Sequence, residues 1–97
     1  MPKPPRWEYL SDAQVMDLMA DEAPSMDADM TEHAAFMLAC AKLAPRESDR
    51  SLLVMLAATL TLSADSDAER VADAAEHHVQ TLRDALAVAD LLASLAQ

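Results

Sequence analysis

The chain contains no glycine in 97 residues, and this absence limits its possible folds more than any other feature of the sequence. Glycine is the residue that tight hairpin turns and left-handed backbone positions use most readily, so a sheet built from hairpins is not expected. The absence also excludes glycine-rich phosphate loops, dinucleotide-binding folds and the nucleophile elbow of hydrolases. The sequence therefore predicts an all-α protein, and its length fits a single domain with one modest core.

Prolines, capping residues and helical spacing divide the chain into two parts. Residues 1–10 form an N-terminal arm, in which three prolines among the first five residues favour an extended course. Residues 11–97 form one helical domain, because apolar residues recur there at helical spacing. The predicted helices cover approximately residues 12–23, 29–43, 46–62 and 67–95. The expected fold is a compact bundle of about four helices with a long C-terminal helix.

Local signals define the helix ends and suggest which helix is central. Ser11, Asp29 and Ser66 are the expected N-caps of the first, second and fourth helices. The third helix contains the run LLVMLAATLTL, residues 52–62, which is apolar apart from two threonines. A helix that is apolar on all sides is normally buried on all sides. We therefore expect the third helix to be the central one, with Met55 in the core.

Acidic residues outnumber basic ones by 17 to 7, which gives a net charge of -10. Direct binding to nucleic acid or to an anionic membrane is not expected, because both need clustered Lys and Arg. The acids gather in residues 8–32, a stretch without Lys or Arg. They are Glu8, Asp12, Asp17, Asp21, Glu22, Asp27, Asp29 and Glu32.

This acidic stretch has two interpretations. Exposed charge can serve solubility alone, but mixed signs would serve that purpose equally well. A polarised negative face speeds encounter with a basic protein surface, and it can occupy a groove that normally holds phosphates. We therefore expect a non-enzymatic protein-binding module that inhibits or regulates a nucleic-acid-binding protein, as anti-restriction and anti-CRISPR proteins of phages and mobile elements do. This expectation is an analogy from size, helix content and charge, not a motif match.

The C-terminal part of the long helix has a second apolar face. Val88, Leu91 and Leu95 lie away from the main apolar stripe of that helix. A second subunit or another partner would cover them; alternatively, the helix end packs under the first helix or the arm. The alternative function is therefore a homodimeric structural or adaptor module whose acidity serves only solubility.

The arm holds Trp7 and Tyr9, two of the three aromatic residues of the chain. Trp7 can fold back and cover one end of the bundle, since a small domain rarely leaves a tryptophan unused. It can also anchor a partner, because tryptophan is favoured at interface hot spots. We favour the first interpretation.

Residues that could bind a metal are few. Asp29 with His33, and Asp73 with His77, have i, i+4 spacing and could together supply four ligands. The Glu-x-x-His motifs of di-iron bundles and the HExxH motif of zinc proteases are both absent. The two aspartates fit better as a helix cap and as part of a solvated face. We therefore expect no metal site.

His78 and Cys40 are the remaining candidates for catalysis. His78 lies in the apolar stripe of the long helix, where a neutral histidine with one satisfied ring nitrogen is the simpler interpretation. Cys40 lies among small apolar residues, without the nearby cations that activate a thiol. We expect no catalytic or cofactor-binding residue, and therefore no enzyme.

The sequence also indicates a compartment. Its single cysteine allows no internal disulfide. No apolar run follows Lys3 and Arg6, as one would in a signal peptide. The longest charge-free run, Ser51 to Ala64, is too short to span a bilayer. We expect a cytoplasmic protein.

Overall fold

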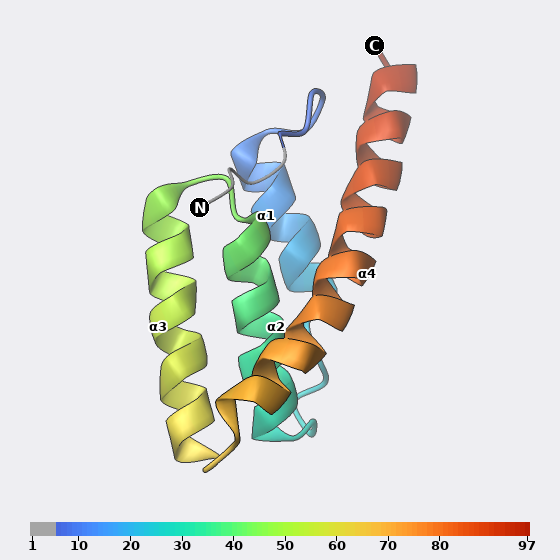
Figure 1. The fold of residues 1–97 in the computed structure, drawn as a ribbon. Coiled ribbons are helices and arrows are strands. Elements are labelled where there is room, and N and C mark those ends of the chain that lie inside the picture. The colour runs from blue at the N-terminus through green and yellow to red at the C-terminus, as the bar shows by residue number, and fades with distance from the viewer. Residues whose placement is uncertain (1–5) are drawn as a thin grey trace.

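The computed structural model describes residues 6–97, and its helices run alternately down and up the molecule (Figure 1). They are α1 (Asp12–Asp21), α2 (Met30–Leu43), α3 (Glu47–Ser63) and α4 (Ala68–Leu95). No strand occurs in this part of the chain, so the all-α prediction is confirmed, and each predicted boundary lies within two residues of the observed one. The extended course expected for residues 1–5 lies outside the described residues.

Side-chain caps begin three of the four helices. The Ser11 hydroxyl accepts a hydrogen bond from the backbone N–H of Gln14, whose side chain accepts one from the Ser11 N–H. Asp29 caps α2, as predicted. The prediction for α4 is wrong by one residue, because Asp67 is the N-cap, and the Ser66 hydroxyl instead bonds to the Thr31 hydroxyl. Ser66 therefore ties the turn after α3 to the start of α2.

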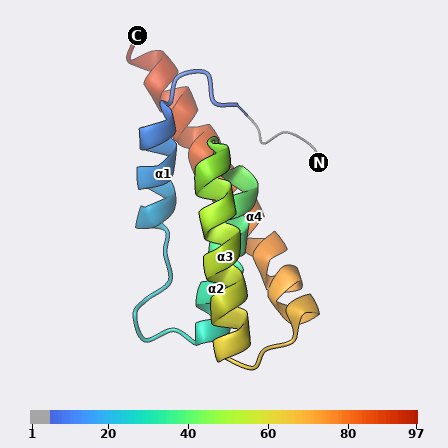
Figure 2. The same cartoon turned by 90° about the vertical axis from the view of Figure 1, so that its left-hand side faces the viewer.

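The central helix is α2, not α3, so the expectation for the third helix is wrong. α2 packs against both α3 and α4, whereas α3 lies at the left edge of the molecule in Figure 1 and in front of α2 in Figure 2. Ala57 is the one buried residue of α3, and Met55 is 66% exposed. The physical reason is side-chain size, because the alanines of α2 let neighbouring helices approach closely on several sides. Its buried residues are Ala34, Ala35, Phe36, Ala39, Cys40, Ala41 and Leu43.

One core joins α1, α2 and α4. Val15 and Met19 of α1 are fully buried in the same cluster as Leu43 of α2 and the inner stripe of α4. That stripe consists of Val71, Ala75, Val79, Leu82 and Leu86. Val79 therefore holds the buried position at which the sequence analysis expected His78. His78 is half-buried beside the core, with its ring edge-on to Phe36.

The turn from α3 to α4 is made without glycine. Asp65 adopts a left-handed backbone conformation, with φ at 52°. Asp and Asn tolerate this region better than other side chains, because a short polar group can bond locally. The backbone N–H groups of Asp65 and Ser66 donate to the carbonyl oxygens of Leu62 and Thr61, which close the end of α3.

The molecule is flat, with extents of 47 × 28 × 19 Å. Within residues 6–97, no helix has the length and apolar character needed to cross a membrane.

Candidate protein-interaction surfaces

The eight acids of residues 8–32 are all exposed, and we refer to them as the acidic surface. Asp17 and Asp21 lie on the side of α1 opposite its buried residues Val15 and Met19, as the helical spacing requires. Asp29 is held by its capping bond to the Thr31 N–H. The acidic surface is therefore presented to solvent along α1 and the segment that leads into α2.

No Lys or Arg neutralises the acidic surface within the described part of the chain. There, the ion pairs that involve Lys or Arg join Lys42 to Glu76 and Arg46 to Asp49. Lys42 lowers the pKa of the Glu76 carboxyl by donating a hydrogen bond to it and by its charge. These pairs lie on α2, α3 and α4, so the negative field of α1 remains uncompensated by contact.

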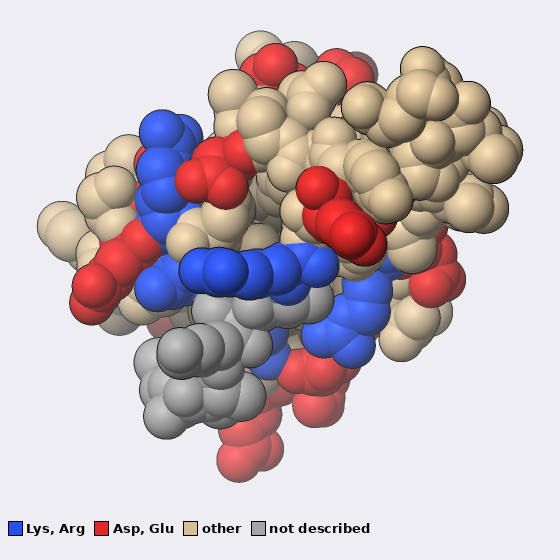
Figure 3. Space-filling view, turned by 90° about the horizontal axis from the view of Figure 1, so that it is seen from above, with Lys and Arg blue, Asp and Glu red and all other residues tan. Residues whose placement is uncertain are grey.

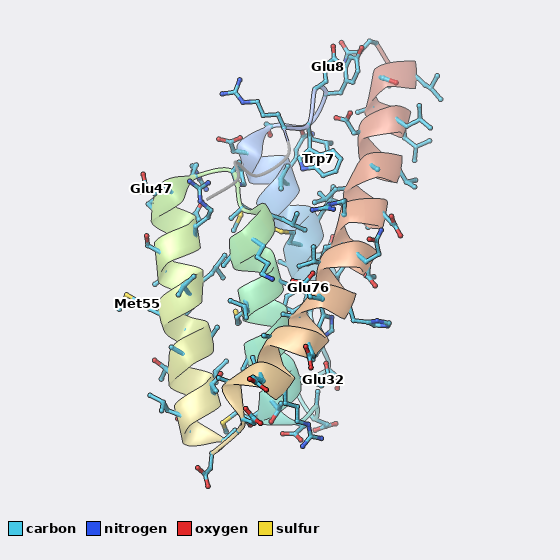
Figure 4. The ribbon with its side chains drawn as sticks, viewed as in Figure 1. Trp7, Glu8, Glu32, Glu47, Met55 and Glu76 are labelled. Atoms are coloured by element: carbon cyan, nitrogen blue, oxygen red, sulfur yellow. The ribbon has the colours of Figure 1, made fainter. Side chains whose placement is uncertain are left out.

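The acidic surface extends over the length of the molecule. Glu8 lies at the end where α4 finishes, and Glu32 lies at the opposite end (Figure 4). Glu32 also bonds to His78, with its Oε2 2.8 Å from the histidine Nε2. At the end of the molecule seen in Figure 3, acidic and basic side chains both occur beside a broad uncharged area. The eight acids are thus spread between the two ends of the molecule and do not form one compact cluster.

The described part of the arm folds back on the bundle. Trp7 is half-buried and packs against the core, as favoured from the sequence. Its indole Nε1 is buried and finds no hydrogen-bond partner among residues 6–97. The backbone N–H of Tyr9 donates to Asp90 Oδ1 at 2.7 Å, which fixes the arm to α4, while the Tyr9 ring stays 42% exposed.

The predicted second face of α4 is exposed in the structure. Val88, Leu91 and Leu95 are 58%, 60% and 74% exposed. Leu92, which the sequence analysis did not single out, is 61% exposed and extends the same patch. We call these four residues the α4 apolar face. Neither the described arm nor α1 covers it.

A second uncovered apolar surface lies on α3, and the sequence analysis missed it by expecting this helix to be buried. We call it the α3 outer face, and it consists of Leu52, Met55, Leu56 and Leu62, with Met55 visible at the edge of the molecule in Figure 4. Beside it, an open groove of about 370 Å³ separates α3 from the start of α4. The groove lining is apolar apart from Thr61. The lack of any charge from Ser51 to Ala64 fits burial within the chain as well as an exposed apolar face, so the sequence held no signal that separates the two.

The potential metal and catalytic groups do not assemble. Within residues 6–97, no three His, Cys, Asp or Glu side chains gather in a group that could hold a metal ion, so the structure does not bring Asp29, His33, Asp73 and His77 together. Cys40 is buried, and burial raises the pKa of its thiol to about 12. A thiol with this pKa stays protonated near neutral pH and is a poor nucleophile.

Comparisons with protein-family models, with curated proteins and with solved structures each found no match to this chain. Three surfaces of the chain are therefore the candidates for binding: the acidic surface, the α4 apolar face and the α3 outer face.

Proposed function

We propose that the protein is a non-enzymatic binding module that docks its acidic surface on a basic surface of another protein. The observation that carries this proposal is that eight exposed carboxylates follow one another along α1 and its flanks without a Lys or Arg partner in the described residues. Exposed, unpaired charge of one sign raises the rate of encounter with a surface of opposite charge.

The partner class we propose is a nucleic-acid-binding enzyme. Such enzymes expose grooves of Lys and Arg that hold phosphates. Carboxylates one helical turn apart, such as those of Asp17 and Asp21, are separated by about 5–6 Å at their Cβ atoms, a spacing that suits contact with successive cations. Occupying the groove would block the enzyme without any chemistry by the inhibitor. We therefore propose the functional class of anti-restriction and anti-CRISPR proteins.

The experiment measures binding to a panel of purified restriction endonucleases and CRISPR effector nucleases. The test variant reverses three charges of the acidic surface, Asp17→Lys, Asp21→Lys and Glu22→Lys. The matched control makes the same net change on α4, with Glu69→Lys, Asp73→Lys and Asp84→Lys, which are also exposed.

We expect at least one panel member to bind the wild type, with an affinity that falls as salt rises because exposed charge pairs are screened. Reversal on the acidic surface should weaken this binding at least about tenfold, whereas the α4 control should change it less. An equal loss of affinity in both variants would show that binding depends on net charge alone, and it would contradict docking through the acidic surface. Binding by no panel member would refute the proposed partner class.

A second candidate function is a homodimeric adaptor, and the α4 apolar face favours it. Large exposed apolar patches on small proteins commonly mark contacts with other chains. In this case the acidity serves solubility, and association is insensitive to salt because apolar burial drives it. Glutamate substitutions at Leu91 and Leu95 would then make the protein monomeric, while charge reversal on α1 would leave the dimer intact.

A further inference from the structure

The α3 outer face lacks the charged residues that a solvent-facing helix normally carries. Exposed helix faces carry charged and polar residues, yet the 14 positions from Ser51 to Ala64 hold no charge. These positions span about 21 Å at 1.5 Å per residue. Leu52, Met55 and Leu62 are 56%, 66% and 82% exposed along this length. The surface therefore carries no charge from one end of this segment to the other, and the exposed Thr59 hydroxyl in its middle donates a hydrogen bond to the Met55 carbonyl oxygen.

The adjoining groove widens this surface. Val54, Ala58 and Leu62 form its α3 wall, Leu38 of α2 contributes to its lining, and Val71 belongs to α4. An apolar groove beside an apolar helix face can receive side chains from an opposing helix, as ridges fit into grooves in helix packing. The α3 outer face therefore has the form of half of a helix–helix interface.

The chain exposes enough surface for a standard protein interface. Such an interface buries roughly 800 Å² on each partner, which is about one eighth of the 6521 Å² that the chain exposes. The exposed side chains of Leu52, Met55 and Leu62 and the adjoining groove supply an uncharged area for it on the α3 side of the molecule.

Charge identifies the occupant as a second copy of the chain. A basic partner would be drawn to the acidic surface, and a charged partner would lose hydration on the α3 outer face without gaining an ion pair. The opposing surface must itself be apolar and free of charge. A two-fold axis supplies such a surface, because it places the α3 outer face of one copy on that of another. It also lets two chains of net charge -10 meet where neither carries a carboxylate.

The ends of α3 determine the relative direction of the two helices. Arg46 and Arg50 balance Glu47 and Asp49 near its N-terminus, while Asp65, Asp67 and Glu69 follow its C-terminus and outnumber Arg70. A parallel pair would bring the two acidic ends together, which like-charge repulsion disfavours. An antiparallel pair places each acidic end beside the neutral end of the other copy and opposes the two helix dipoles.

We propose that the protein forms a homodimer in which the α3 outer faces of two copies pack antiparallel about a two-fold axis. This dimer goes beyond the binding function proposed above and does not depend on it, because the acidic surface lies on α1 and its flanks. It differs from the adaptor alternative in the helix that makes the contact.

The first measurement is the solution mass by light scattering after size exclusion, over a range of protein concentrations. The test variant carries Met55→Glu and Leu62→Glu, and the matched control carries Leu91→Glu and Leu95→Glu on the α4 apolar face. All four positions are exposed, and glutamate is a good helix former, so folding should persist. Circular dichroism checks that it does.

We expect a dimeric wild type, a dimeric α4 control and an α3 variant whose dissociation constant is raised at least about 100-fold. A wild type that stays monomeric at all concentrations overturns the proposal. The proposal is also overturned if the α3 variant is still dimeric, or if only the α4 variant is monomeric.

If both variants are monomeric, a cross-linking experiment decides. Thr59 lies near the middle of the charge-free segment and is exposed, so Thr59→Cys should form an intermolecular disulfide close to the two-fold axis. The buried Cys40 should not interfere. Cross-linking through Thr59→Cys supports the proposal, and cross-linking only through a matched Leu91→Cys overturns it. Loss of the dimer leaves binding of the acidic surface to a basic protein intact, so the two proposals fail separately.

Discussion

Cys40 shows how burial decides the chemistry of a single residue. Only 4% of its surface is exposed, within the small-residue packing of α2. Burial raises the pKa of its thiol from 9.0 to about 12, because the thiolate would lose its hydration. The sequence indicated an inert cysteine from its apolar neighbours, and the structure supplies the physical cause.

The shifted pKa of Cys40 predicts a loss of stability in alkaline solution. Above pH 9, the unfolded chain releases the thiol proton, whereas the folded chain keeps it up to about pH 12. The unfolded state then binds fewer protons, so the free energy of unfolding falls as pH rises. The slope contributed by Cys40 approaches about 1.4 kcal/mol per pH unit inside this window. Urea unfolding at pH 8 and pH 10.5 measures it.

The control for this prediction is Cys40→Ala, which removes the titrating group. Its unfolding free energy should fall less between the same two pH values than that of the wild type. An identical fall in both proteins would show that other groups cause the alkaline loss.

At the scale of whole helices, the sequence predicted where helices lie better than what each one contacts. Ser11 and Asp29 are local caps, and Pro24 and Pro45 follow the ends of α1 and α2, so these boundaries depend on neighbouring residues alone. The roles of α2 and α3 depend on the rest of the fold. An apolar helix must avoid water, but its composition does not say whether its own chain or another covers it.

His78 illustrates the same limit within one helix. Both His78 and Val79 fit the spacing of the apolar stripe to within one residue. The structure buries Val79 and turns His78 toward Glu32. The rotation of α4 about its axis depends on how its side chains fit against α2, which helical spacing does not contain. The α3 outer face was missed for a similar reason, since exposure depends on which neighbours a helix has.

Because α2 is the central helix and α3 is mostly exposed, truncating a leucine to alanine should destabilise the protein more on α2 than on α3. Leu43→Ala should lower the free energy of unfolding by about 2–5 kcal/mol, because Leu43 is fully buried and leaves a cavity. Leu52→Ala on α3 should cost less than about 1 kcal/mol, because its side chain is mostly exposed. Urea unfolding of dilute, monomeric protein compares them. A larger loss of unfolding free energy in Leu52→Ala than in Leu43→Ala would show that α3, and not α2, is the central helix.

At the scale of the whole molecule, net charge sets the response to salt. With a net charge of -10, carboxylates repel one another in the folded state more than in the expanded unfolded chain. Raising sodium chloride from about 0.05 M to about 0.5 M shortens the screening length from roughly 14 Å to roughly 4 Å. The midpoint of urea unfolding should therefore rise with salt.

Charge reversal on the acidic surface provides the comparison. Asp17→Lys, Asp21→Lys and Glu22→Lys each add two units, which changes the net charge from -10 to -4. This variant should respond less to salt than the wild type. A wild-type midpoint that stays constant or falls with salt would show that self-repulsion does not limit stability.

The absence of glycine, even from the turn at Asp65, restricts the conformations of the unfolded chain. Glycine loses more backbone freedom on folding than any other residue. A chain with no glycine therefore begins from a narrower denatured ensemble. Such a chain loses less conformational entropy on folding, so less buried apolar surface is needed to offset that loss. A small, flat domain can then leave apolar helix faces exposed and still fold.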